Sequence, residues 1–72
     1  MPRLAPLKPL EVEKILLKNG FIYVNTVGSH KHFSNRTTKA HTTIPFHSQD
    51  LPTGTLRSIV RQSQLPINLF RR

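Results

Sequence analysis

The sequence FIYVNTVGSHKHFS, residues 21–34, contains two runs of strand-forming residues separated by a glycine. Aromatic and β-branched residues dominate the first run, and the second run, HKHFS, follows Gly28 and Ser29 directly. Two such runs around a short turn indicate an antiparallel hairpin. We therefore expect the chain to reverse direction at residues 27–29.

The alternation of side chains along the second run determines which residues share a face of the sheet. Successive side chains on a strand point to opposite faces, so His30 and His32 share one face while Lys31 and Phe33 share the other. An aromatic side chain in so short a domain is expected to pack against the core. If Phe33 does so, both histidines lie on the open face.

A third strand is predicted at residues 40–46, AHTTIPF. Thr42 and Ile44 alternate there with His41 and Thr43. Pro45 cannot donate a ladder hydrogen bond, so the strand is expected to end near it. The polar and basic run NRTTK, residues 35–39, is expected to form the loop before this strand.

Apolar residues at helical spacing predict a helix over residues 9–19, PLEVEKILLKN. Val12, Ile15 and Leu16 lie on its apolar face. Pro9 is suited to the first turn, and Gly20 can adopt the left-handed conformation that ends a helix.

A second helix is predicted between Pro52 and Pro66, where its apolar stripe comprises Leu56, Ile59 and Val60. Pro52 suits its first turn, and either Asp50 or Ser48 is expected to cap it. Pro66 is expected to stop it after Leu65. The run that follows, INLFRR, either docks on the domain or frays.

The order helix, three strands, helix predicts an α+β fold. A three-stranded antiparallel sheet with both helices on one face buries both apolar stripes. This α-β-β-β-α order is similar to that of double-stranded-RNA-binding domains, which read A-form RNA by its shape, phosphates and 2′-hydroxyls.

The length of 72 residues predicts one domain over residues 1–72, with an extended, proline-rich lead-in at 1–8 and a C-terminal tail at 66–72. A domain of this size buries a thin core. The chain has no cysteine, which rules out disulfides and thiolate chemistry and suits a cytoplasmic protein. No apolar run approaches the length of a membrane span, so no membrane partner is expected.

The net charge of +8, from eleven Lys and Arg against three Asp and Glu, predicts a polyanionic partner. RNA and an acidic protein both fit this charge.

Three interpretations of the histidines follow from the residues alone. In the first, His30 and His32 are solvated surface groups. In the second, they converge with His41 on a metal ion, and in the third, one of them transfers protons. The metal interpretation is the weakest, because no nearby Cys, Asp or Glu completes a zinc ligand set. In the third, histidine serves the attack of a ribose 2′-hydroxyl on its own phosphate, which needs no metal ion or other cofactor.

The candidate cations for holding RNA phosphates are Lys31, Arg36 and Lys39. Each of them could equally well be a solvated surface charge. Arg57 and Arg61 lie four apart on the second helix, where an anionic partner would relieve their repulsion. The free backbone N–H groups at the start of that helix, residues 53–55, form a further candidate phosphate site. His47, after the third strand, is either a second catalytic group or a structural loop residue.

Four blocks of the sequence, in order, closely resemble the HicA toxins of bacterial and archaeal toxin–antitoxin pairs: LLKNGF, GSHKHF, TIPFH and DLPTGTLRSIVRQ. The resemblance runs from about residue 10 to residue 65. It implies an mRNA interferase with a double-stranded-RNA-binding-like fold that a HicB antitoxin holds inactive.

The resemblance also implies roles for individual residues. The catalytic histidine of the family corresponds to His30, Gly28 is expected to shape the hairpin, and Ser29 to contact phosphate. His47 matches a histidine of the family, Arg57 matches an exposed position of the second helix, and His32 inherits no role. The alternative function is a basic RNA-binding module without catalysis, which would share the same cations.

Overall fold

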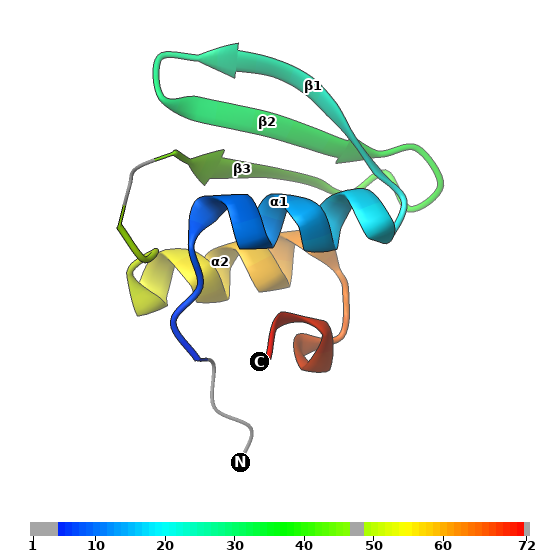
Figure 1. The fold of residues 1–72 in the computed structure, drawn as a ribbon. Helices are drawn as coiled ribbons and strands as arrows, with labels where there is room; N and C mark the ends of the chain where they lie inside the picture. The colour runs from blue at the N-terminus through cyan, green and yellow to red at the C-terminus, as the bar shows by residue number, and fades with distance from the viewer. Residues whose placement is uncertain (1–4, 47–48, 72) are drawn as a thin grey trace.

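The structure, a computed structural model, describes residues 5–46 and 49–71. The sheet is antiparallel, with strand order β1-β2-β3, and both helices cover one of its faces (Figure 1). This arrangement confirms the predicted α+β fold. The elements are α1 (Pro9–Lys18), β1 (Phe21–Val27), β2 (His30–Asn35), β3 (His41–Pro45), α2 (Thr53–Ser63) and a 3-10 helix, η1 (Ile67–Phe70).

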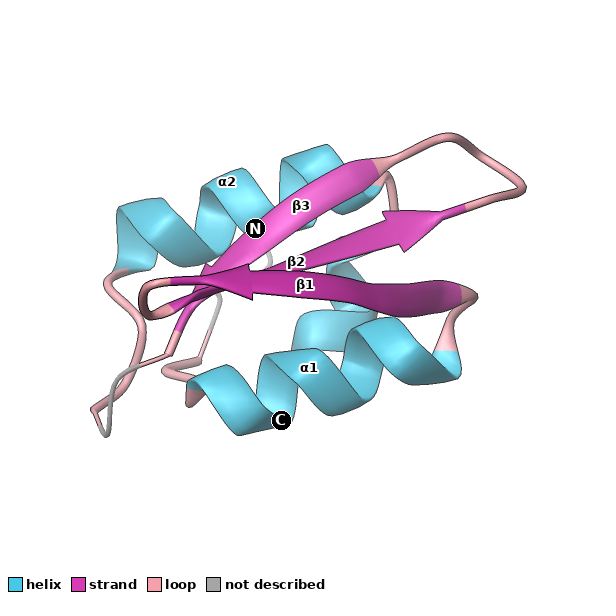
Figure 2. Cartoon of the chain, turned by 90° about the horizontal axis from the view of Figure 1, so that it is seen from above, coloured by secondary structure: helices cyan, strands magenta, loops and turns pink. Residues whose placement is uncertain are grey.

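The two helices lie side by side beneath the sheet, α1 under the β1 side and α2 under the β3 side (Figure 2). Their apolar stripes face the same core as predicted: Val12 and Leu16 of α1 are buried, and so are Leu56 and Ile59 of α2. The helices leave the opposite face of the sheet open. The shared core explains why two short amphipathic helices are stable in this chain.

The start and end of α1 follow the sequence signals. Pro9 occupies its first turn, and the carboxylate of Glu11 accepts a hydrogen bond of 2.9 Å from the backbone N–H of Lys8. Gly20 follows the helix with a φ of +90°, a conformation that favours glycine. A β-carbon at Gly20 would also approach the side-chain nitrogen of Asn35 to 3.0 Å.

The boundaries of α2 differ from the prediction. The N-cap is Pro52, which makes no side-chain cap bond, so the expectation for Asp50 is wrong; Ser48 lies outside the described residues. The helix ends at Ser63, before Pro66 could stop it. The Ser63 hydroxyl donates to the carbonyl of Val60 and accepts from the N–H of Leu65, which diverts the chain from the helical hydrogen-bond pattern.

Segments near both ends of the described chain contribute to the core. Of the two alternatives for the C-terminal run, docking is the one observed, because η1 places Phe70 in a fully buried position beside α1. In the lead-in, Leu7 is buried, and its carbonyl accepts a hydrogen bond of 2.8 Å from the N–H of Leu51. These contacts enlarge an otherwise thin core.

Asn35, at the end of β2, joins the loop before β3 to the end of α1. Its buried side chain accepts hydrogen bonds from the N–H groups of Thr37 and Thr38, at 2.9 and 3.1 Å. Its amide nitrogen donates to the carbonyl of Asn19 at 3.3 Å. This buried side chain therefore fixes the turn at one end of the sheet.

We predict that Asn35→Ala lowers the free energy of unfolding by about 2 kcal/mol, because two backbone N–H groups lose their acceptor. Urea denaturation followed by circular dichroism measures this change. Thr37→Ala is the control, since the described contact of Thr37 uses its backbone, and it should change the free energy by less than about 0.5 kcal/mol. Equal effects from the two variants would contradict this role for Asn35.

A second prediction concerns Gly28, which turns the hairpin with a φ of +61°. A β-carbon added there would meet nothing within 4 Å, so Gly28→Ala costs only backbone strain, about 1 kcal/mol. Gly54 also has open space but lies inside α2 without a positive φ. Gly54→Ala should therefore stabilise the protein by about 0.5 kcal/mol. Thermal unfolding of both variants should give shifts of opposite sign; shifts of the same sign would contradict the argument.

Candidate functional site

His30 is the first residue of β2 and follows the turn at Gly28 and Ser29. Its position is fixed on both sides: it pairs with Val27 of β1 and with Pro45 of β3. The carbonyl of Ser29 accepts a further hydrogen bond of 2.7 Å from the N–H of Phe46. The ladder thus holds the backbone of His30 firmly, and its side chain is exposed.

The alternation predicted for β2 is confirmed by burial. Phe33 is fully buried on the helix side, where its ring meets that of Tyr23 edge to face at 6.0 Å. His30 and His32 lie on the opposite face. His30 is exposed and His32 is half-buried.

A groove of about 440 Å³ runs beside His30, between β3 and α2. Its walls mix polar side chains with the apolar Pro45 and Ile59, and no lysine or arginine is among the described residues that line it. The residues that line it are His30, His41, Thr43, Pro45, Thr55, Ser58, Ile59 and Gln62.

The groove has two distinct ends. His30 pairs with Pro45 at one end, whereas His41 pairs with Ser34 towards the other. Four positions along β3 separate Pro45 from His41, which is about 13 Å at the usual rise of a strand. His30 and His41 are therefore too far apart to act on the same phosphate.

The end that holds His30 adjoins the start of α2. Thr55, in the first turn of that helix, lines the groove together with His30. Pro52, as N-cap, provides no side-chain acceptor for the first N–H groups of the helix. A helix start of this kind attracts anions, because its N–H groups and its dipole both favour negative charge.

At the other end, the side chain of Gln62 is oriented by β3. The hydroxyl of the buried Thr42 donates a hydrogen bond of 2.9 Å to the amide oxygen of Gln62. The amide NH₂ of Gln62 stays available as a donor in the groove, where it can bind a carbonyl or phosphate oxygen.

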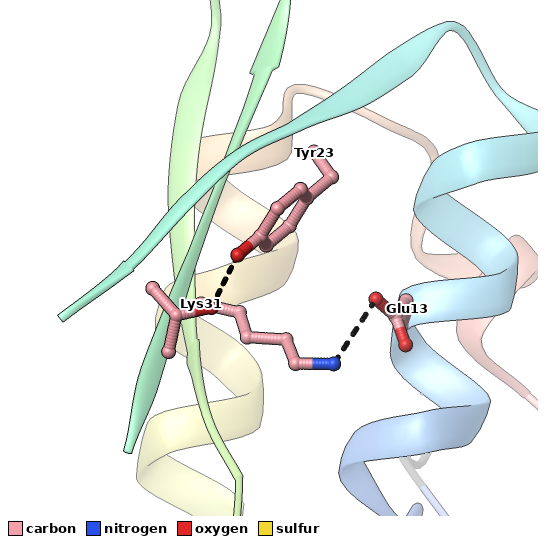
Figure 3. A network of polar contacts seen from close by, with 4 residues as sticks. Glu13, Tyr23 and Lys31 are labelled. Atoms are coloured by element: carbon pink, nitrogen blue, oxygen red, sulfur yellow. Dashed lines mark hydrogen bonds and ion pairs between the residues drawn. The ribbon is translucent and has the colours of Figure 1, made fainter. Parts of the chain in front are cut away.

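Lys31 lies on the helix side of the sheet. Its ammonium group is 3.7 Å from a carboxylate oxygen of Glu13 on α1 (Figure 3). The same group lies 4.1 Å from the ring centre of Phe46. The ion pair and the aromatic contact both engage this cation away from His30.

The other predicted cations do not gather at His30. Arg36 and Lys39 are exposed in the loop that follows β2, about 16 Å from His30 along the strand. Arg57 is exposed on α2, as expected, but the helical spacing places it on the side away from the groove residues Thr55 and Gln62.

The remaining histidines have different positions. His32 and His41 approach each other on the open face, with 3.4 Å between Nδ1 of His32 and Nε2 of His41. Within residues 5–46 and 49–71, no three His, Cys, Asp or Glu side chains form a group that could hold a metal ion. His47 lies outside the described residues.

The sequence interpretation missed Ser58 and Gln62, and it named Thr55 only as part of the helix start at residues 53–55. These polar residues follow one another at helical spacing beside the apolar stripe of α2. That spacing marks a face of the helix, but only the packing of α2 against β3 turns the face into the wall of a groove. None of the described helices is long and apolar enough to cross a membrane.

Comparison with known proteins gives one finding about the family. No curated protein matches the chain. The family model described as HicA toxin of bacterial toxin–antitoxin matches residues 10–65, a range that includes the three strands, α2 and all of α1 except Pro9. The chain therefore belongs to the HicA toxin family of bacterial toxin–antitoxin systems.

Proposed function

We propose that this toxin is an endoribonuclease that cleaves mRNA in the cytoplasm, with His30 as its catalytic acid–base group. The observation that carries the proposal is the position of His30, exposed at the end of a groove that also adjoins the start of α2. A proton-transfer group and an anion-binding helix start thus lie at one end of the same groove. This pairing is what phosphate transfer in RNA requires.

In the proposed reaction the RNA supplies its own nucleophile. The 2′-oxygen forms a bond to the adjacent phosphorus, and the bond between phosphorus and the 5′-oxygen of the next nucleotide breaks. The products are a 2′,3′-cyclic phosphate and a 5′-hydroxyl. His30 accepts the proton of the 2′-hydroxyl and, once protonated, returns one to the leaving 5′-oxygen. The reaction as proposed uses no metal ion or other cofactor.

Negative charge on the reacting phosphate needs donors close to His30. The first N–H groups of α2, at Thr53, Gly54 and Thr55, are the candidates, because Thr55 shares the groove with His30. Gly28 and Ser29 hold the turn against which the same phosphate would rest. Of the phosphate sites predicted from the sequence, the helix start thus takes the role at the reacting phosphate, rather than the lysines and arginines.

The exposed cations serve phosphates further along the RNA. Arg36 and Lys39 share the loop between β2 and β3, whereas Arg57 lies on α2, so the loop and the helix would contact different parts of a long or folded RNA. Lys31 would contribute only if RNA competed for it with Glu13. Contacts of this kind raise affinity without selecting a sequence. His47, which matches a histidine of the family, is proposed as a further RNA-binding residue.

A HicB-type antitoxin is the proposed protein partner. Membership of a toxin–antitoxin family makes an antitoxin partner plausible, and the net charge of +8 favours an acidic one. An antitoxin that covers the groove would block His30 and the start of α2 together. Neutralisation then requires no change in the fold of the toxin.

We predict that His30→Gln lowers the rate of RNA cleavage at least about 100-fold, because the proton-transfer group is lost. RNA binding and the free energy of unfolding should remain close to those of the wild type, since the side chain is exposed. Cleavage of a labelled mRNA fragment, measured with and without EDTA, tests both the residue and the metal-free mechanism.

Asn25→Ala is the matched control, because Asn25 is an exposed residue of the same hairpin and lies outside the groove. It should cleave RNA at the wild-type rate. Wild-type cleavage by the His30 variant would remove His30 from the mechanism. A wild-type protein that binds RNA without cleaving it would instead support a non-catalytic RNA-binding module.

We also predict a role for Gln62 in substrate binding. Gln62→Ala should raise KM for RNA about fivefold with little change in kcat, because a single neutral hydrogen bond contributes about 1 kcal/mol. Gln62→Glu can keep the contact with Thr42 but directs a negative charge at the groove, so its effect on KM should be larger. Steady-state kinetics of the two variants test this order, and unchanged KM values in both would exclude Gln62 from the RNA contact.

A further inference from the structure

The open face of the sheet carries a pair of histidines that the proposed cleavage reaction does not use. His32 and His41 lie diagonally across β2 and β3, since His32 pairs with Thr43 and His41 with Ser34. Their ring centres are 5.5 Å apart, and the ring planes are tilted by 30°. Two ring nitrogens converge, Nδ1 of His32 and Nε2 of His41, at a separation of 3.4 Å.

This separation is long for a hydrogen bond between the rings, since most N–H hydrogen bonds in proteins are close to about 2.9 Å. It suits two ligands of one zinc ion. Zinc binds histidine nitrogen at about 2.05 Å with tetrahedral geometry, which places two such nitrogens about 3.3 Å apart. A square-planar arrangement would bring them to about 2.9 Å. The observed spacing therefore matches a tetrahedral ion.

The surroundings of the pair leave room for such an ion. His41 is exposed and His32 is half-buried, so the rings are accessible from solvent. The hydroxyl of Thr43 lies within hydrogen-bond distance of the same nitrogen, 3.1 Å from Nδ1 of His32. A bound zinc ion would replace this contact, and the freed hydroxyl could then hydrogen bond to a water on the metal. No third side chain of the usual ligand types joins the pair within the described ranges, so the other coordination positions would hold water or an anion.

We propose that His32 and His41 form a two-histidine site for Zn²⁺ on the open face of the sheet. The site differs from the three-histidine set considered from the sequence, because His30 lies two positions from His32, about 7 Å along the strand. His41 also lines the groove, so a bound ion would add positive charge at the end away from His30. The site does not depend on the proposed function.

The test is a zinc titration of the full chain without an affinity tag, by calorimetry in a buffer free of chelators. Zinc alone is the probe. The wild type should bind one zinc ion per chain. His32→Gln and His41→Gln should each weaken binding at least about tenfold. His30→Gln is the matched control and should bind zinc as the wild type does.

Circular dichroism of each variant checks that the fold is retained, and NMR spectra should show zinc-induced shifts centred on His32 and His41. Three results would overturn the proposal: no binding by the wild type at millimolar zinc, unchanged binding in both His32→Gln and His41→Gln, or an equal loss in His30→Gln.

Discussion

The burial of Phe33 determines the orientation of the whole candidate site. This ring is fully buried in the layer between the sheet and the helices, and β2 is the central strand. Because side chains alternate along a strand, burying Phe33 places His30 and His32 on the open face and Lys31 on the helix side. A shift of β2 by one residue would reverse every one of these positions. The packing of one aromatic ring therefore decides which chemistry is exposed to solvent.

The site also depends on contacts between segments distant in sequence. The groove exists because α2 packs against β3, and Gln62 is oriented by Thr42, twenty residues earlier in the chain. The core beneath is completed by Leu7 and Phe70, close to the two ends of the described chain. In so small a domain these terminal contacts stabilise the same layer that supports the groove. Stability and site geometry therefore have a common origin.

Much of the fold could be predicted from the sequence, because the signals were local. The strand runs around Gly28, the helical spacing of Val12 and Leu16, and the stop at Gly20 each depend on neighbouring residues, and the structure confirms them. The end of α2 was predicted wrongly, because the Ser63 hydroxyl competes with the helix before Pro66 is reached. Which residues line the groove could not be predicted, because that depends on how α2 crosses β3.

The groove and the rest of the surface carry different kinds of side chains. The described lining of the groove consists of histidines, neutral polar residues and two apolar ones, while exposed cations lie elsewhere on the surface. Affinity for RNA would thus come from cations around the domain, whereas cleavage would take place at one end of the groove. The most direct test of cleavage by 2′-hydroxyl attack is to identify, by mass spectrometry, the RNA ends that the wild-type toxin leaves. The account predicts 2′,3′-cyclic phosphates and 5′-hydroxyls, and no cleavage where the 2′-hydroxyl is replaced by hydrogen. Ends with 3′-hydroxyls and 5′-phosphates would contradict it.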